Sequence, residues 1–127
     1  MGVVPDPARD RRRTGIDAEM LLNSRGGRIH LFPAVAPGTA IGFRNFQARG
    51  GFLVSACKDA ENVYHLEIES RRDIQCQVMN PWPGKRVFVR DDNNGKQIPV
   101  RADTSNGECL VFPASAGIRY VLTPKLS

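Results

Sequence analysis

The most regular hydrophobic pattern in the chain is a two-residue alternation near its middle. Across residues 63–70, apolar side chains alternate with polar ones: Tyr64, Leu66 and Ile68 against His65, Glu67 and Glu69. Successive side chains of a β-strand point to opposite faces of its sheet, so this period of two predicts a strand with one face in water. The apolar run Phe52–Lys58 precedes this strand across Asp59–Asn62, and the two together predict a β-hairpin.

Further short apolar segments, separated by turn residues, continue toward the C-terminus. A third strand is expected at Ile74–Met79, and residues 80–84 end it because their two prolines cannot donate to a sheet ladder. Four more strands are expected as a sequential meander: Arg86–Arg90, Gln97–Arg101, Glu108–Phe112 and Ile118–Leu122. Its first two turns contain Asn94-Gly95 and Asn106-Gly107, pairs that tolerate the positive φ of tight turns. The pattern predicts an all-β chain, an antiparallel β-sandwich of about eight short strands with one short N-terminal helix.

The region before these strands has a different character. Residues 1–15 combine two prolines with a dense charge cluster, which is typical of a disordered basic tail. Residues 16–24 (IDAEMLLNS) place apolar side chains at helical spacing and predict the helix, interpreted as a remnant of a longer barrel helix, which Gly26-Gly27 ends. An extended segment at Arg28–Phe32 and a loop at Ala34–Gly42 follow, so residues 28–50 are interpreted as a linker strand and loop. Residues 16–127 are expected to form a single domain.

Size and charge narrow the classes of function. With 127 residues, of which 41% are hydrophobic, the chain is long enough for one domain with its own core. The net charge is +5, and residues 1–15 carry four arginines against two aspartates, which leaves +3 for the rest. A phosphate-binding arm is one interpretation of the tail, but the remainder shows neither a basic stripe nor the stacking aromatics of nucleic-acid binders. Nucleic acid is therefore not an expected partner.

Membrane association and bound cofactors are not expected either. No apolar run reaches the roughly 18 residues that a membrane span needs, and the N-terminus lacks the apolar stretch of a secretory signal. The chain is expected to be soluble, in a compartment that the sequence does not specify. The three cysteines, Cys57, Cys76 and Cys109, form an odd set without a CxxC pair and are interpreted as small buried hydrophobic residues rather than disulfides or metal ligands.

Two pairs of residues are candidates for catalysis. Glu67 and Glu69 share one face of their strand at roughly 7 Å, a separation that suits the acid and base of an inverting glycosidase, but a solvated strand face gives the same pattern more often. Cys57 and His65 lie on paired strands, yet no nucleophile-elbow glycines surround Cys57. A structural thiol is the favoured interpretation.

The range Asp91–Gly95 looks like part of a calcium-binding loop. The first and last ligand positions of such a loop would fall on Arg90 and Arg101, where carboxylates are needed. A hairpin turn is therefore the favoured interpretation.

Trp82, the single tryptophan, lies in a proline-rich turn. An exposed indole there offers a flat apolar face to a sugar ring, and His30 and Arg49 could donate hydrogen bonds to its hydroxyls, as in a carbohydrate-binding module. Large aromatic side chains are on average well buried, so capping of the sandwich core or packing on a neighbouring domain is favoured.

Several phrases in the first two thirds of the chain carry a resemblance to a known family. They are residues 18–24 (AEMLLNS), 27–34 (GRIHLFPA) and 43–52 (FRNFQARGGF), followed by Cys76 and residues 80–82 (NPW). In order and spacing, from about Gly15 to Trp82, they resemble the end of glycoside hydrolase family ninety-five, the α-L-fucosidase-like enzymes. In that family a phrase like AEMLLQS closes the last helix of the barrel, and a β-domain follows.

The resemblance implies a parent enzyme with an (α/α)₆ barrel that hydrolyses α-L-fucosides, or a similar sugar such as L-galactose, with inversion. The family's general base is an aspartate in a phrase like QIDGNFG shortly before the AEMLL helix, and its general acid lies further upstream. Here Arg9–Thr14 occupy that place, and Asp17 is not followed by Asn-Phe-Gly, so no catalytic role transfers to this chain. The chain alone is expected to be a non-catalytic C-terminal accessory domain and not an enzyme.

In the complete enzyme such a domain would dock on the barrel. The expected docking surface consists of apolar residues that would otherwise have only half a core to cover them: Met20, Leu21, Leu22, Ile29, Leu31 and Phe32. The expected partner is the catalytic barrel of a glycoside hydrolase or a second copy of the chain, with fucosylated glycans as a further class. Two alternatives are left open: a free-standing carbohydrate-binding module, and a truncated structural protein that oligomerises through the helix and strand edges.

Overall fold

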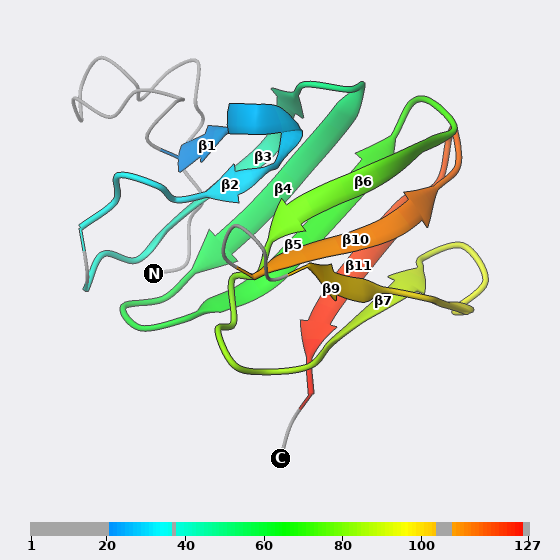
Figure 1. Ribbon diagram of the computed structural model, residues 1–127. Helices are drawn as coiled ribbons and strands as arrows, with labels where there is room; N and C mark the ends of the chain where they lie inside the picture. The colour runs from blue at the N-terminus through cyan, green and yellow to red at the C-terminus, as the bar shows by residue number, and fades with distance from the viewer. Residues whose placement is uncertain (1–20, 37, 104–107, 126–127) are drawn as a thin grey trace.

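The computed structural model of the protein describes residues 21–36, 38–103 and 108–125. These residues form eleven β-strands and one 3₁₀ turn, and every pair of named strands is antiparallel. The strands lie in two facing layers, with a small two-stranded ladder beside them (Figure 1). The predicted all-β, antiparallel sandwich is therefore confirmed.

The larger layer is a six-stranded sheet in the order β3-β4-β5-β11-β7-β8. Its strands are β3 (Ile41–Ala48), β4 (Phe52–Lys58), β5 (Val63–Ser70), β7 (Val87–Asp91), β8 (Gln97–Ile98) and β11 (Arg119–Pro124). The β4–β5 hairpin has the bounds that the alternating pattern predicts. Its turn is held by Asp59 Oδ1, which accepts hydrogen bonds from the N–H groups of Asn62 at 2.7 Å and Glu61 at 2.8 Å. These bonds stabilise the carboxylate and lower the pKa of Asp59.

The smaller layer is a three-stranded sheet in the order β6-β10-β9, and it lies in front of β5, β11 and β7 in Figure 1. Its strands are β6 (Ile74–Met79), β9 (Arg101–Asp103) and β10 (Cys109–Ala114). Next to it, β1 (Leu22–Asn23) pairs with β2 (His30–Leu31) around the 3₁₀ turn η1 (Arg25–Gly27).

Ile29 joins this N-terminal ladder to the smaller layer. It forms a parallel bridge with Val78, in which the Ile29 N–H donates to the Gln77 carbonyl at 2.8 Å and the Met79 N–H donates to the Ile29 carbonyl at 2.9 Å. The N-terminal segment therefore covers the outer edge of β6, which would otherwise present unpaired peptide groups.

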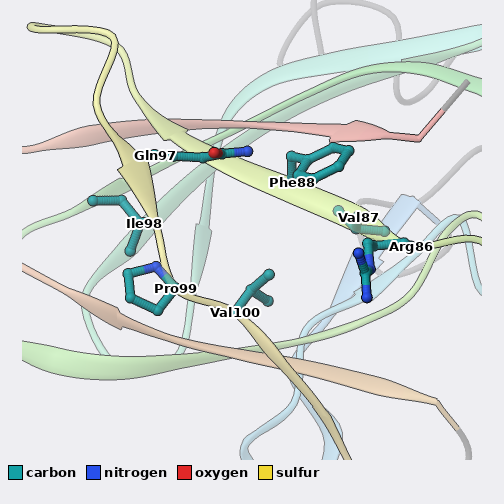
Figure 2. A pocket seen from close by; sticks show the side chains of 7 residues that line it. All are labelled: Arg86, Val87, Phe88, Gln97, Ile98, Pro99 and Val100. Carbon is teal, nitrogen blue, oxygen red and sulfur yellow. The ribbon is translucent and has the colours of Figure 1, made fainter.

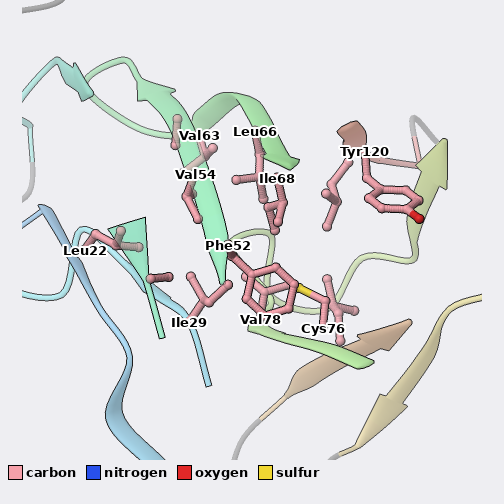
Figure 3. Close-up of a cluster of buried hydrophobic side chains, with 14 of the residues drawn as sticks. Leu22, Ile29, Phe52, Val54, Val63, Leu66, Ile68, Cys76, Val78 and Tyr120 are labelled. Atoms are coloured by element: carbon pink, nitrogen blue, oxygen red, sulfur yellow. The ribbon is translucent and has the colours of Figure 1, made fainter. Parts of the chain in front are cut away.

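The inward faces of the two layers enclose one hydrophobic core, and Figure 3 shows side chains of β4 and β5 pointing toward those of β6. Phe43, Leu66 and Ile68 of the larger layer and Phe112 of the smaller layer are each at most 1% exposed. Full burial of such a side chain stabilises a fold by about 1.5–3 kcal/mol. Phe112 also meets Tyr120 edge-on, with 5.3 Å between ring centroids, which links β10 to β11 across the core.

The predicted helix over residues 16–24 is wrong in its last three residues. Residues 16–20, like the basic tail 1–15, lie outside the described residues, but Leu22–Asn23 is a strand. Gly26 and Gly27 have φ values of +64° and +75°, which turns the chain back so that Leu22 lies opposite Leu31. Pairing with the nearby β2 is more favourable here than a helix, because so short a helix has little stability of its own.

The interpretation of residues 28–50 as a linker is also wrong. β3 begins at Ile41, inside the predicted loop 34–42, and runs for eight residues as an edge strand of the larger layer. Its polar and bulged middle section hid the strand pattern, because Arg44 and Asn45 are both exposed.

The irregularity in β3 is a β-bulge. Phe43 pairs with Ala56 and Phe46 pairs with Val54, so Arg44 and Asn45 together lie opposite Ser55. Asn45 takes a left-handed conformation with a φ of 55°, and its N–H donates to Ser55 Oγ at 2.9 Å. Such a bulge bends an edge strand and discourages pairing with another sheet.

The predicted sequential meander after residue 86 is correct in two pairings, β7 with β8 and β9 with β10, and wrong in its last connection. β7 and β11 pair with each other in the larger layer, whereas β9 and β10 belong to the smaller one. The predicted strand Gln97–Arg101 is divided into β8 and β9 because Pro99, between them, has no N–H to donate, and the chain changes layers there.

The two predicted Asn-Gly turns have different outcomes. Gly95 has a φ of +71°, and its N–H donates to the Asp91 carbonyl at 2.8 Å, so the turn between β7 and β8 is confirmed. The turn expected at Asn106-Gly107 lies outside the described residues.

Candidate binding sites

The apolar residues expected to form a docking surface lie mainly inside the chain's own core. Leu21, Leu22, Ile29 and Phe32 expose between 2% and 9% of their surface. Leu31 is half-buried against the same core, and Met20 lies outside the described residues. The expected exposure is not observed because β1, β2 and Ile29 fold back onto the sandwich.

Phe32 closes this N-terminal segment. Its N–H donates to the Leu21 carbonyl at 2.7 Å, and its ring lies 5.5 Å from that of Phe43. The residue has a φ of 52°, an unfavourable conformation for a bulky side chain that the surrounding packing maintains.

Trp82 lies in the connection between β6 and β7 and is only 6% exposed. Its indole Nε1–H donates to the Val63 carbonyl at 2.7 Å, and its backbone N–H donates to Asn80 Oδ1 at 2.8 Å. The Asn80 amide is held in turn by Glu108, at 2.8 Å. The favoured interpretation, capping of the core, is confirmed, and the exposed face that a sugar would stack on is missing.

The structure does not bring together the three residues proposed for sugar binding. Trp82 bonds to Val63 at the start of β5, whereas Arg49 lies in the turn before Phe52, which pairs with Ser70 at the end of β5. An eight-residue strand separates these positions by roughly 20 Å. His30 is half-buried in β2, and the Arg49 N–H donates to Ser24 Oγ at 3.0 Å.

Glu67 and Glu69 lie on the outer face of the larger layer, as the solvated-face interpretation predicts. Their side chains are 27% and 33% exposed. His65 Nε2 lies 3.3 Å from Glu67 Oε1, and Arg119 Nη2 donates to Glu69 Oε1 at 3.3 Å. Each carboxylate therefore has its own basic neighbour on an open sheet.

The Cys57 thiol has a different neighbour from the one that catalysis would need. Cys57 lies opposite His65 as predicted, but the imidazole contacts Glu67, and the neighbour of the thiol is the phenol of Tyr64. The proximity of Cys57 raises the pKa of Tyr64. In the part of the chain that the structure describes, no base is positioned on the thiol.

The inward orientation expected for Tyr64 is wrong, since the residue is 61% exposed. The register between β4 and β5 shifts after the Cys57–His65 pair, and Lys58 pairs with Val63, so Tyr64 has no partner on β4. This irregularity turns its side chain outward.

Cys76 and Cys109 are buried free thiols, as predicted, whereas Cys57 is only half-buried. Burial raises the pKa of both Cys76 and Cys109. Among the residues that the structure describes, no three His, Cys, Asp or Glu side chains are grouped so that they could hold a metal ion.

A pocket that the sequence did not indicate lies at the β7–β8 edge of the larger layer (Figure 2). It has a volume of about 420 Å³ and is lined by seven residues: Arg86, Val87, Phe88, Gln97, Ile98, Pro99 and Val100. β8 pairs with β7 only through Ile98 and Gln97, after which the chain leaves for the other layer and the space opens. Pro99 was the available signal, because a proline inside an expected strand marks a departure from the ladder.

Comparisons with known proteins add no relative. Neither a scan against protein-family models nor a search of curated proteins finds a match to this chain. In the described part of the chain, no helix has the length and apolar character needed to cross a membrane.

Proposed function

We propose that this chain is a non-catalytic accessory β-domain of the kind that follows the barrel in α-L-fucosidase-like glycoside hydrolases. The observation that carries the proposal is the packing of the segments that resemble that family. The phrases GRIHLFPA and FRNFQARGGF span β2, β3 and the start of β4. They contribute Ile29, Phe32, Phe43 and Phe52 to the core. The resemblance therefore involves residues that build the sandwich, which suits a β-domain whose substrate chemistry lies elsewhere.

The arrangement of the carboxylates supports a role without catalysis. Inversion needs an acid and a base on opposite faces of the sugar, with room for a water molecule. Glu67 and Glu69 instead lie side by side on one open face, each beside a basic residue, and neither lines the β7–β8 pocket.

The surface that would meet a barrel must differ from the one expected from the sequence. Since Leu22, Ile29 and Phe32 are buried in this chain, the remaining candidate is the outer side of the β1–β2 ladder, where Asn23 and His30 are half-buried. In the family that the chain resembles, the barrel precedes the β-domain in sequence, so a covalently linked barrel would also reach the sandwich from its N-terminal side. Interfaces between domains of one chain typically bury roughly 600–1,500 Å².

A reconstitution experiment tests the proposal. This chain is mixed with the barrel of a family ninety-five fucosidase that is truncated just before the residue corresponding to Leu21. The mixture is examined by size-exclusion chromatography with light scattering. Hydrolysis of a chromogenic α-L-fucoside is measured for each component and for the mixture. We expect a one-to-one complex, a raised unfolding temperature of the barrel, and no hydrolysis by the chain alone.

Two matched variants locate the interface. His30→Asp should weaken the complex, whereas Val121→Asp, which changes a half-buried residue on the outer face of the larger layer, should not. Fucoside hydrolysis by the chain alone that Glu67→Gln abolishes would contradict the non-catalytic role. Failure to form a complex at micromolar concentration would contradict the accessory role.

A further inference from the structure

We propose that the β7–β8 pocket binds an acidic sugar, that is, a pyranose ring that carries a carboxylate. The pocket is called the β7 wedge below and is defined by its seven lining residues, Arg86–Phe88 and Gln97–Val100. Its volume of about 420 Å³ lies within the range of small-molecule sites in proteins. The inference goes beyond the accessory role, because it assigns a ligand to this domain itself.

Peptide groups of β7 form one wall of the wedge. The Lys125 N–H donates to the Arg86 carbonyl at 2.7 Å, which directs the peptide groups of Arg86 toward the β11 side. Along an antiparallel strand these groups alternate between the two sides, so those of Val87 point toward the β8 side. No β8 residue pairs with β7 beside Val87, since the last pair between the two strands is Val89–Ile98. The peptide groups of Val87 thus lie on the wedge side of β7, where the residue is 2% exposed and leaves them little room for a ligand.

Side chains of mixed character form the other walls. In Figure 2, Gln97 extends toward Phe88, and Ile98, Pro99 and Val100 follow the chain as it leaves β7. The Phe88 ring is half-buried, which leaves part of it open to a ligand, and Gln97 is exposed. The wedge therefore combines an aromatic surface with an amide that both donates and accepts hydrogen bonds.

The charge at the wedge is positive. Arg86 is exposed and forms no ion pair within the residues that the structure describes. Lys85 and Lys125 are exposed beside it, and none of the seven lining residues is acidic. An unpaired guanidinium with two further cations nearby favours an anionic ligand, and its planar fork suits a carboxylate.

An acidic sugar matches each of these features at once. The C–H face of its ring packs on Phe88, its hydroxyls pair with the Gln97 amide, and its carboxylate pairs with Arg86. A neutral sugar leaves the guanidinium unused. A fatty acid leaves the Gln97 amide without a partner, which costs binding free energy.

The test is a titration of the full chain with digalacturonic acid, followed by ¹H–¹⁵N correlation spectra, with the uncharged methyl ester as the matched ligand. We expect shifts confined to residues 86–88, 97, 98 and 100, and binding of the ester that is weaker by about tenfold or more, because a charge-assisted pair is lost. Arg86→Gln should weaken acid binding by a similar factor and leave the rest of the spectrum unchanged. Arg71→Gln, which changes an exposed arginine after β5 and away from the wedge, is the control and should have no effect.

Other outcomes overturn the inference. These are the absence of shifts in the wedge at millimolar ligand, equal binding of the acid and its ester, or shifts centred on His30 and Arg49. Stronger binding of a glutamate-rich peptide or of inorganic phosphate at the same residues would show that the wedge prefers another anion to an acidic sugar. None of these results bears on the reconstitution with the barrel, so the two proposals fail independently.

Discussion

At the bulge in β3, glycine should be more stable than alanine, which is the reverse of their usual order in a strand. Asn45 has a φ of 55°, and a residue with a Cβ loses roughly 1–2 kcal/mol in this left-handed conformation. Glycine avoids that cost, but its freedom in the unfolded chain removes roughly 0.4–1 kcal/mol of stability. Asn45→Gly should therefore be more stable than Asn45→Ala by about 0.5–1 kcal/mol.

Gln47 provides the matched control, because it is exposed on the same strand in a regular pair with Leu53. There the order should be normal, with Gln47→Gly less stable than Gln47→Ala by about 0.5–1 kcal/mol. Comparing the two sites cancels the unfolded-state contribution, and the contrast should equal the left-handed cost of about 1–2 kcal/mol. Urea denaturation measures all four variants, with fluorescence of the single buried Trp82 as the signal. The reasoning is refuted if Asn45→Ala is as stable as Asn45→Gly.

Three further predictions concern the core, the thiols and the β4–β5 turn. Trp82→Phe leaves the Val63 carbonyl without its donor and should cost about 1–3 kcal/mol in urea denaturation, and a cost near zero would contradict the capping role. Iodoacetamide should label Cys57 in the folded chain and reach Cys76 and Cys109 only after unfolding, because burial raises the pKa of the latter two thiols. Peptide mass spectrometry after a short exposure shows which cysteines are labelled first. Early labelling of Cys76 would contradict the prediction. The pKa of Asp59 is lower in the folded chain than in the unfolded one, so its stabilisation is present at neutral pH and should be lost below roughly pH 4, as the pH falls through the folded-state pKa. The stability difference between the wild type and Asp59→Asn should therefore shrink in acid, and a difference independent of pH would count against it.

Local pattern was sufficient for strands whose neighbours in space are also neighbours in sequence. β4 and β5, which pair with each other as a hairpin, have the predicted bounds because turn residues separate them. The pattern failed where a distant partner decides the conformation. β11 was expected to follow β10 in the meander, but it pairs with β5 and β7, which lie much earlier in the sequence. Neither partner is visible in a short window of sequence.

The candidate site could not be predicted from the sequence for a related reason. The β7 wedge results from a ladder that stops at Ile98 and from the layer change at Pro99. No chemical motif marks Arg86 or Phe88, since an isolated basic and an isolated aromatic residue occur in most strands. Trp82 drew attention as the only tryptophan, but its burial follows from a hydrogen bond to Val63, which is far from it in sequence.

The position of β11 has a consequence for the biosynthesis of this domain. The last described strand lies in the interior of the larger layer, where it pairs with β5 on one side and β7 on the other. Until residues 119–124 have left the ribosome, β5 and β7 cannot be joined, and their facing edges remain unpaired. Because the closing contacts are so distant in sequence, this topology favours folding after translation, on the slower time scale of β-sandwiches. A nascent chain stalled before Arg119 would expose the unpaired edges of β5 and β7 and should therefore bind chaperones more strongly than the complete chain.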